Sequence, residues 1–298
     1  SLDYHLTLDK LRLNHLNISD RSYLLPGGKG INVAAVLTSL GHDCKTLGFV
    51  GGFTGQQLIY MLNRQGLTND FIMLDEEVTR INIKIKADKE TELNASGPFI
   101  KELDVQRLLS KLDQINDDDY LVLSGSIPLG FTQNIYVMIN ERLKDKKIRI
   151  CIDTRGKHLQ ECLAYRPFLI KPNLQELQEL FKTKITNKKQ LITYMYELQA
   201  LGAQHVLVSL GKDGAYLLSK DHYLYKGFAP LGKLISSVGS GDAMVAGFIS
   251  AMINDHDNAE TALQTAIAAG SASAFSQGLA AKEAIDELVE QVIIKKIK

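Results

Sequence analysis

Continuous apolar runs, separated by helical patterns, dominate the middle of the chain. They are Tyr120–Leu123, Ile148–Ile152, Phe168–Ile170 and His205–Val208. Strands that are apolar along their whole length are typical of a parallel sheet covered by helices on both faces. Nearer the N-terminus the pattern predicts helices over 32–40 and 56–65, each ended by a glycine, and a strand over 46–50. The alternation therefore predicts an α/β fold with a mostly parallel central sheet.

Two other stretches alternate apolar and polar residues. Arg80–Lys86 does so strictly and His5–Asp9 more weakly, which predicts strands with one covered and one solvated face. We expect them in a separate small β-layer of residues 4–25 and 79–97, serving as a lid over a site or as a dimer surface. The α/β core would then comprise residues 26–78 and 98–298, with 1–3. The chain begins at Ser1 inside an expected strand, so we also expect residues upstream.

Composition narrows the class of protein. The 298 residues are 45% hydrophobic and 23% charged, with 34 basic and 34 acidic residues. Zero formal charge argues against a nucleic-acid or anionic-membrane partner, and no apolar run reaches the ~18–20 residues of a membrane span. The three cysteines, Cys44, Cys151 and Cys162, lack metal-ligand spacing. These features predict a protein of the reducing cytoplasm.

The segment Val238–Phe248 carries the most informative motif. Gly239, Ser240 and Gly241 precede Asp242, which opens an apolar helical pattern. Small residues at a helix start expose backbone N–H groups and the positive end of the helix dipole, a combination suited to phosphate. A carboxylate beside a phosphate is explained if it takes a proton from a hydroxyl that receives the phosphoryl group. Taken alone, the segment is equally well explained as a turn with an aspartate near the helix N-cap.

A second glycine-rich loop, Pro26–Ala34, also leads into a helix. It has neither P-loop nor GxGxxG spacing. Its glycines permit close approach of a polyol, Asn32 can bond hydroxyls and Lys29 can hold a phosphate. A plain left-handed turn is the alternative.

Three further loops follow predicted strands, where ligands bind in open α/β sheets. In Lys171–Glu176, Asn173 and Glu176 share a helix face and could hold magnesium through water, or simply form a capping box; both can hold together. Taken alone, Ser124–Gly130 is more typical of a capped turn than of a ligand site, and Ser209–Ala215 is more typical of a hairpin turn. Arg80, at the start of the alternating strand, is an exposed arginine or a phosphate ligand.

The order and spacing of these motifs resemble the phosphofructokinase B branch of the ribokinase-like kinases over essentially the whole chain. The resemblance rests on Gly27–Ala34, Thr79-Arg80, Ser124–Pro128, Lys171–Glu176, Ser209–Gly214 and Val238–Phe248. Within the family the chain looks most like bacterial 1-phosphofructokinases and tagatose-6-phosphate kinases. Gly51–Gly55, Arg80–Lys84 and Thr91–Pro98 favour the first group. The resemblance implies a three-layer α/β/α sandwich with a small β-sheet lid.

The resemblance also implies roles. Asp242 would be the catalytic base, and Gly239, Ser240 and Gly241 the anion hole. The sugar phosphate would be bound by Asp3, Gly28, Lys29, Asn32, Arg80, Asn94 and Ser126, with Lys29 and Arg80 on its phosphate. ATP and Mg²⁺ would be bound by Lys171, Asn173, Glu176, Ser209, Gly211 and Gly214, with Asn173 and Glu176 near the metal. A homodimer formed through the lid is implied by the same analogy, through the apolar positions Ile81, Ile83 and Ile85. Packing of these positions on their own domain alone is the alternative.

Two positions depart from the family pattern. The second anion-hole residue is usually alanine and here is Ser240, which keeps the backbone N–H. An arginine that often precedes the Pro-Gly-Gly loop is replaced by Ile18, so phosphate binding would depend on Lys29, Arg80 and others.

The implied reaction is ATP-dependent phosphorylation of fructose 1-phosphate at its C6 hydroxyl. Tagatose 6-phosphate or fructose 6-phosphate are alternative substrates for the same residues. A non-catalytic sugar-phosphate-binding regulator is an alternative of another class, because fold alone does not grant chemistry. A nicotinamide-dependent oxidoreductase is disfavoured by the missing GxGxxG.

Overall fold

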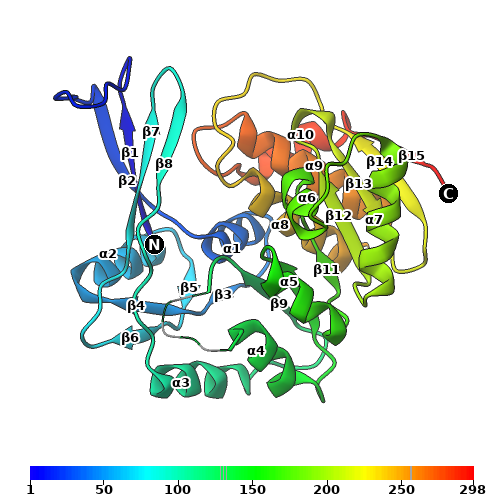
Figure 1. Ribbon diagram of the computed structural model, residues 1–298, viewed down its shortest axis with the longest axis horizontal. Coiled ribbons are helices and arrows are strands. Elements are labelled where there is room, and N and C mark those ends of the chain that lie inside the picture. The colour runs from blue at the N-terminus through cyan, green and yellow to red at the C-terminus, as the bar shows by residue number, and fades with distance from the viewer. Residues whose placement is uncertain (128, 130, 132, 256) are drawn as a thin grey trace. The chain divides into compact units, whose positions relative to one another are not determined.

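The computed structural model describes residues 1–127, 129, 131, 133–255 and 257–298. The chain divides into two compact units (Figure 1). Unit 1 comprises Ser1–Ile31, Cys44–Lys111 and Ile127–Thr132, and unit 2 comprises Asn32–Asp43, Leu112–Ser126 and Gln133–Lys298. Among the described residues, no helix is both long and apolar enough to cross a membrane. The domain boundaries expected from the sequence, with a lid over 4–25 and 79–97, stay a prediction.

Unit 1 contains a four-stranded sheet in the order β2-β1-β7-β8. The strands are β1 (Leu2–Thr7), β2 (Arg21–Pro26), β7 (Ile81–Lys86) and β8 (Glu90–Leu93). β1 is parallel to β7, and the other two pairings are antiparallel. Cross-strand partners share a face, so Asp3 lies beside Asn82 on one face while Tyr4 lies beside Ile83 on the other. The alternating pattern thus separates a polar face from an apolar face.

The rest of unit 1 holds two short parallel pairs and two helices. β3 (Lys45–Thr46) pairs with β5 (Thr68–Asn69), and β4 (Phe49–Gly51) pairs with β6 (Ile72–Leu74). The helices are α2 (Gly52–Arg64) and α3 (Glu102–Leu112). The single strand expected over 46–50 is therefore interrupted, at the point where Gly48 adopts φ 149°. α1 (Lys29–Ser39) begins three residues before the start predicted from the pattern.

Unit 2 is built on a seven-stranded sheet in the order β15-β14-β13-β12-β11-β10-β9. The four apolar runs become β9 (Tyr120–Ser124), β10 (Arg149–Asp153), β11 (Leu169–Ile170) and β12 (His205–Ser209). They are parallel neighbours in that order, as the pattern predicts. The sheet then continues through the antiparallel strands β13 (Ala215–Leu218), β14 (Leu224–Phe228) and β15 (Ile293–Lys296). The sheet is therefore mixed: the hairpin turn predicted at Ser209–Ala215 accounts for the antiparallel β13, whereas β14 and β15 were not predicted.

Helices cover both faces of this sheet. On one face, a side chain at Gly227 of β14 would overlap Ile267 of α9 (Ala259–Ala274). On the opposite face, α7 (Lys188–Ala200) places Lys188 over Tyr216 of β13. Unit 2 by itself therefore has three layers. Its other helices are α4 (Ile135–Leu143), α5 (Lys157–Cys162), α6 (Leu174–Leu180), α8 (Ser240–Asn254) and α10 (Lys282–Val289), with short 3-10 turns at Leu163–Tyr165 and Gly211–Asp213.

Candidate functional site

The N-terminus of α8 in unit 2 has the geometry expected of an anion cradle. Its N-cap, Gly239, has a left-handed backbone with φ 79°, which glycine adopts without strain. A Cβ there would also come within 2.7 Å of Leu279 Cδ2. The first N–H groups of a helix have no acceptor within the helix and lie at its positive end. Glycine at position 239 thus lets the chain enter α8 through a left-handed turn, in which the Ser240 N–H makes only a long bond of 3.4 Å to the Ser237 carbonyl.

Asp242 lies in the first turn of α8 and is buried, with 6% of its surface exposed. Asn32 of α1 donates a hydrogen bond of 2.7 Å from Nδ2 to Asp242 Oδ2. A buried carboxylate is costly unless its oxygens accept hydrogen bonds, and this donor fixes the carboxylate's orientation. The structure thus brings together two residues predicted from separate motifs.

Lys171 and Asp153 form a buried ion pair at the carboxyl ends of β11 and β10. Lys171 Nζ lies 3.6 Å from Asp153 Oδ1, and the side chains are 5% and 2% exposed. A Cβ on Gly241 would lie 3.1 Å from the same ammonium, so glycine leaves room for Lys171 beside the start of α8. Sequence reasoning found Lys171 but missed Asp153. The available signal was an acid that ends an apolar strand.

Asn173 and Glu176 form the capping box of α6. The Asn173 side chain accepts from the Glu176 N–H at 2.8 Å, and Glu176 Oε2 accepts from the Asn173 N–H at 2.9 Å. The capping interpretation is therefore confirmed. No cluster of three or more His, Cys, Asp or Glu residues suited to a metal occurs in the described part of the chain. A magnesium ion bound here would therefore need ligands other than three such side chains.

The segment Ser209–Ala215 is the turn of a β-hairpin, as its sequence predicts. Ser209 ends β12, a 3-10 turn follows, and β13 returns antiparallel. Gly211 and Gly214 have positive φ values of 58° and 78°, and a side chain at Gly214 would overlap the carbonyl of Gly227. Ser126 is exposed in the loop after β9. Pro128 and Gly130 of that loop motif lie outside the described residues.

In unit 1 the polar face of the sheet holds a second buried cluster. Asp3 is 8% exposed and Asn82 is 5% exposed, and Asn82 Nδ2 donates to Asp3 Oδ1 at 2.8 Å. A side chain at Gly27 would overlap the Asp3 carboxylate, which explains the glycine at that position. Asn82 Oδ1 has no hydrogen-bond partner among the described residues. Sequence reasoning missed Asn82, although it is the buried polar position of the alternating strand.

The remaining predicted sugar-phosphate residues lie near this cluster in sequence and topology. Gly28 has φ 117° just before Lys29 opens α1. Arg80 precedes β7 and donates from Nη1 to the carbonyl of Ala95 at 3.3 Å. Asn94 follows β8 and accepts at 3.2 Å from Lys84 Nζ, which also pairs with Glu92. These contacts connect Arg80 and Asn94 to the β7–β8 hairpin.

A carboxylate and a buried lysine beside a glycine-rich helix N-terminus define an enzyme that transfers a phosphoryl group to a hydroxyl. The family model described as pfkB family carbohydrate kinase matches residues 8–285. The chain therefore belongs to the pfkB family of carbohydrate kinases, and the three-layer unit 2 is the fold expected of it.

Individual relatives extend the similarity over the whole chain. A 1-phosphofructokinase of Bacillus subtilis is 37% identical over 297 residues, which cover 100% of this chain and 97% of that protein. A D-tagatose-1-phosphate kinase of Bacillus licheniformis is 36% identical, covering 99% and 96%. A solved structure of a putative phosphofructokinase from Staphylococcus aureus has a TM-score of 0.85 and 36% identity, covering 100% and 96%.

Proposed function

We propose that the protein transfers the γ-phosphoryl group of ATP to the C6 hydroxyl of fructose 1-phosphate, giving fructose 1,6-bisphosphate and ADP. One observation carries the proposal. The buried Asp242 at the start of α8 belongs to a chain that is 37% identical along its length to a 1-phosphofructokinase.

The chemical step is divided among residues of unit 2. Asp242 accepts the proton of the acceptor hydroxyl, whose oxygen bonds to the γ-phosphorus as the bond to the β–γ bridging oxygen breaks. The backbone N–H groups from Gly239 to Asp242 stabilise the charge on the transferring group, and Lys171 adds a positive charge. Asn32 holds the Asp242 carboxylate in the orientation that receives the proton.

Magnesium would be held mainly by ATP phosphates and water. Mg²⁺ in nucleotide sites keeps several waters and takes one or two carboxylates, so the lack of a cluster of three ligands among the described residues is compatible with it. Asp153 and Glu176 supply carboxylates, and Asn173 an amide oxygen, for contacts through water. When bound, the metal neutralises charge on the phosphates.

The sugar phosphate is assigned mainly to unit 1. Buried Asp3 and Asn82 provide acceptors and donors for sugar hydroxyls, with Asn94 and Ser126 adding polar groups. Gly28 permits close approach of the sugar. Lys29 and Arg80 would bind the phosphate, Arg80 with its planar fork and Lys29 as a point charge. The turn Ser209, Gly211 and Gly214 would admit the nucleotide.

Tagatose 1-phosphate is the second candidate substrate, because a D-tagatose-1-phosphate kinase is 36% identical. We test the choice with kcat/KM for fructose 1-phosphate, tagatose 1-phosphate, tagatose 6-phosphate and fructose 6-phosphate, each with Mg-ATP. The kcat/KM for fructose 1-phosphate should be at least tenfold higher than that for each of the other three sugar phosphates. A higher value for another sugar phosphate would move the assignment to it. Sugar-dependent thermal stabilisation without turnover would indicate a non-catalytic binding protein.

The proposal also covers the cellular location and the oligomeric state of the enzyme. We propose that it works in the cytoplasm, where ATP is available and its three cysteines, all free in the structure, remain reduced. We also propose a homodimer formed through the apolar face of the unit 1 sheet.

A further inference from the structure

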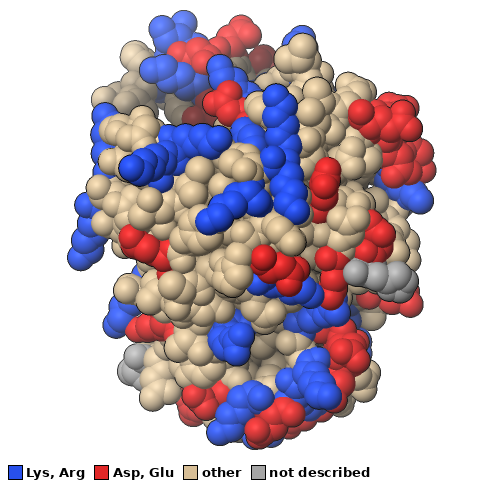
Figure 2. Space-filling view, turned by 90° about the vertical axis from the view of Figure 1, so that its right-hand side faces the viewer, with Lys and Arg blue, Asp and Glu red and all other residues tan. Residues whose placement is uncertain are grey.

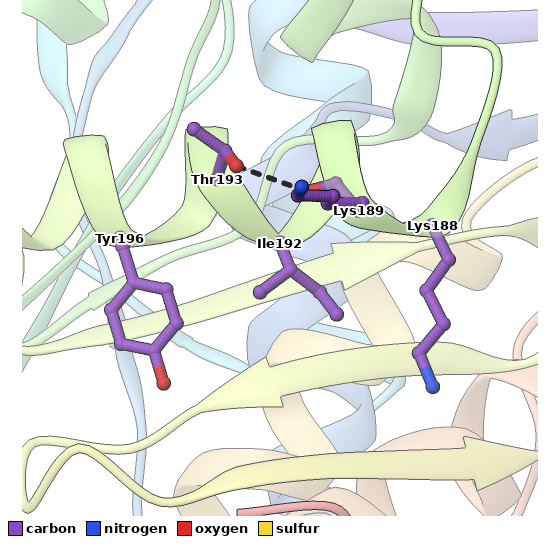
Figure 3. Close-up of a pocket in the computed structure, with 5 residues that line it drawn as sticks. All are labelled: Lys188, Lys189, Ile192, Thr193 and Tyr196. Carbon is purple, nitrogen blue, oxygen red and sulfur yellow. Dashed lines mark hydrogen bonds between the residues drawn. The ribbon is translucent and has the colours of Figure 1, made fainter.

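A surface depression runs along α7 of unit 2, on the sheet face opposite α9. Its volume is 420 Å³ and its lining residues are Lys188, Lys189, Ile192, Thr193 and Tyr196. Lys188, Ile192 and Tyr196 follow one another at intervals of four along the helix and point toward the strands in Figure 3. The Tyr196 hydroxyl is buried and has no hydrogen-bond partner in the described part of the chain. The depression therefore offers a wall that is mainly apolar.

Positive charge is concentrated where α7 begins. Lys188 and Lys189 occupy its first turn, which contains no acidic residue. Cations at the positive end of a helix are unfavourable, and acidic residues are preferred there. The helix is still well capped, because the Asn187 side chain accepts from the Gln190 N–H. The two lysines thus have an electrostatic cost that an anionic ligand would remove.

Lys226 of β14 does not line the depression, but it places a buried ammonium group over Tyr216, the ring that Lys188 also approaches. It is 8% exposed, and its Nζ donates to the carbonyl of Asp213. Lys226 and Lys188 lie over the same ring, 4.7 and 5.8 Å from the centroid of Tyr216. Burial is the main cause that lowers the Lys226 pKa; Asp213 raises it, and Lys188 lowers it by a smaller amount. Neither lysine forms a salt bridge with any described residue, so two like charges gather without a carboxylate in ion-pair contact.

Neighbouring residues enlarge the positive region. Lys226 and Lys295 of β15 both lie over Phe228, at 5.3 and 5.5 Å. Figure 2 shows several long basic side chains across the upper part of the face that carries the β14–β15 end of the sheet. Lysine on an edge strand such as β15 is explained by protection against strand pairing. That explanation does not cover Lys188, which lies on a helix, or Lys226, which lies on an inner strand.

We propose that this face of unit 2 binds an organic phosphate with a planar ring. The phosphate would lie between Lys188 and Lys226, and the ring against Ile192 and Tyr196. An ammonium group is a good point-charge partner for phosphate, and the apolar wall favours a ring over water. None of these residues belongs to the proposed active site, so the ligand would bind in addition to the kinase substrates.

Phenyl phosphate is the probe, measured by titration calorimetry. The protein is first saturated with ADP and fructose 1-phosphate, so that the proposed substrate sites are filled. We expect one equivalent of phenyl phosphate per chain and at least a tenfold higher Kd in Lys188→Gln and in Lys226→Met. The control Lys144→Gln removes an exposed lysine of the α4 C-cap and should leave the Kd unchanged.

Inorganic phosphate tests the apolar wall separately. It should bind about tenfold more weakly than phenyl phosphate, because it lacks the ring that buries apolar surface. The proposal is overturned if wild-type protein gives no binding heat, or if Lys188→Gln, whose exposed side chain can change without unfolding the protein, binds the probe as wild type does. Equal affinity for both probes would overturn the role of Ile192 and Tyr196. Kinase assays of Lys188→Gln without the probe should match wild type, which separates this site from the proposed function. Lys226→Met is left out of this comparison, because the Lys226 ammonium group donates to the Asp213 carbonyl within the turn assigned to the nucleotide.

Discussion

Asp242 and Asn32 are paired at the residue scale by a hydrogen bond between α8 and α1. A buried carboxylate held by an amide is positioned to receive a proton from a hydroxyl. Asp242→Asn keeps the size of the side chain and removes the base. We expect kcat to fall by about 10²–10⁴ with little change in ATP binding, the range typical of general-base catalysis. Steady-state kinetics with fructose 1-phosphate and a nucleotide titration measure the two effects.

The matched control lies at the other end of the same helix. Asp255 is the exposed C-cap residue of α8, and Asp255→Asn should leave kcat within about twofold, since surface changes away from a site have small effects. Near-normal turnover of Asp242→Asn would contradict its role as the base. An equal loss in both variants would point to damage of the helix instead.

The missed residues show what limits prediction at this scale. Gly239 and Asp242 were found because the small residues and the acid are adjacent in sequence. Asp153 was missed because its partner, Lys171, follows the neighbouring strand of the sheet, β11. Asn82 was missed because its partner Asp3 comes from a strand far away in the sequence. Residues defined by long-range pairing leave little local signal.

The capping box of α6 is an element-scale feature with two separable functions. Glu176 caps the helix through an oxygen that a glutamine also supplies, whereas the proposed magnesium contact needs its charge. Glu176→Gln should therefore change the free energy of unfolding by less than about 1 kcal/mol while raising the Mg²⁺ concentration for half-maximal rate severalfold. Denaturant unfolding and a magnesium titration of the rate measure the two functions.

Glu179→Gln, a change on the same helix at an exposed position, is the control and should alter neither quantity. If Glu176→Gln leaves the magnesium dependence as it is in wild type, the residue is a cap and not a metal contact.

His205 makes β12 sensitive to acid. It is fully buried between Phe168 and Phe248, and burial lowers its pKa from 6.5 to about 3. The unfolded chain therefore binds a proton below pH 6.5 that the folded chain does not, so stability falls as the pH drops from 6.5 toward 3. By this linkage the loss at pH 5 is about 2 kcal/mol.

The test for His205 compares two pH values. Between pH 7 and pH 5 the unfolding free energy of wild type should fall by about 2 kcal/mol more than that of His205→Leu. This difference does not depend on how stable the variant is at pH 7. His158→Leu, at an exposed position, should keep the wild-type dependence. The same pH dependence in wild type and His205→Leu would assign acid sensitivity to other groups.

Prediction at the element scale succeeded where the pattern was strong. The four mostly apolar runs became parallel neighbours, because a sheet covered on both faces selects apolar residues on both sides of each strand; Arg149, at the start of β10, is a half-buried exception. The predicted hairpin turn at Ser209–Ala215 implied β13, but β14 and β15 were not predicted; β15 (Ile293–Lys296) is short, mostly exposed and paired with a strand far away in the sequence. A short solvated edge strand has almost no periodic signal of its own.

Assembly is the question at the scale of the whole molecule, and the unit 1 sheet bears on it. The face with Asp3 and Asn82 is polar, whereas Tyr4, Leu24, Ile83 and Leu93 are cross-strand neighbours on the other face. Tyr4 and Leu93 are 37% and 54% exposed. Contiguous apolar surface on a sheet is typical of a protein–protein contact. The homodimer proposed above would cover this face with the same face of a second copy, in the two-fold symmetry that most homodimers use.

Leu93→Lys places a charge on this face at an exposed edge-strand position, where the fold tolerates lysine. We expect the dimer dissociation constant to rise at least thirtyfold, because a buried charge without a partner costs about 2 kcal/mol or more at an interface. Sedimentation velocity over a concentration series, with and without sugar phosphate, measures the shift. Leu231→Lys changes a leucine of unit 2 that is 98% exposed and should sediment as wild type does. A monomeric wild type, or a dimer that both variants retain, would mean that this face is covered in some other way.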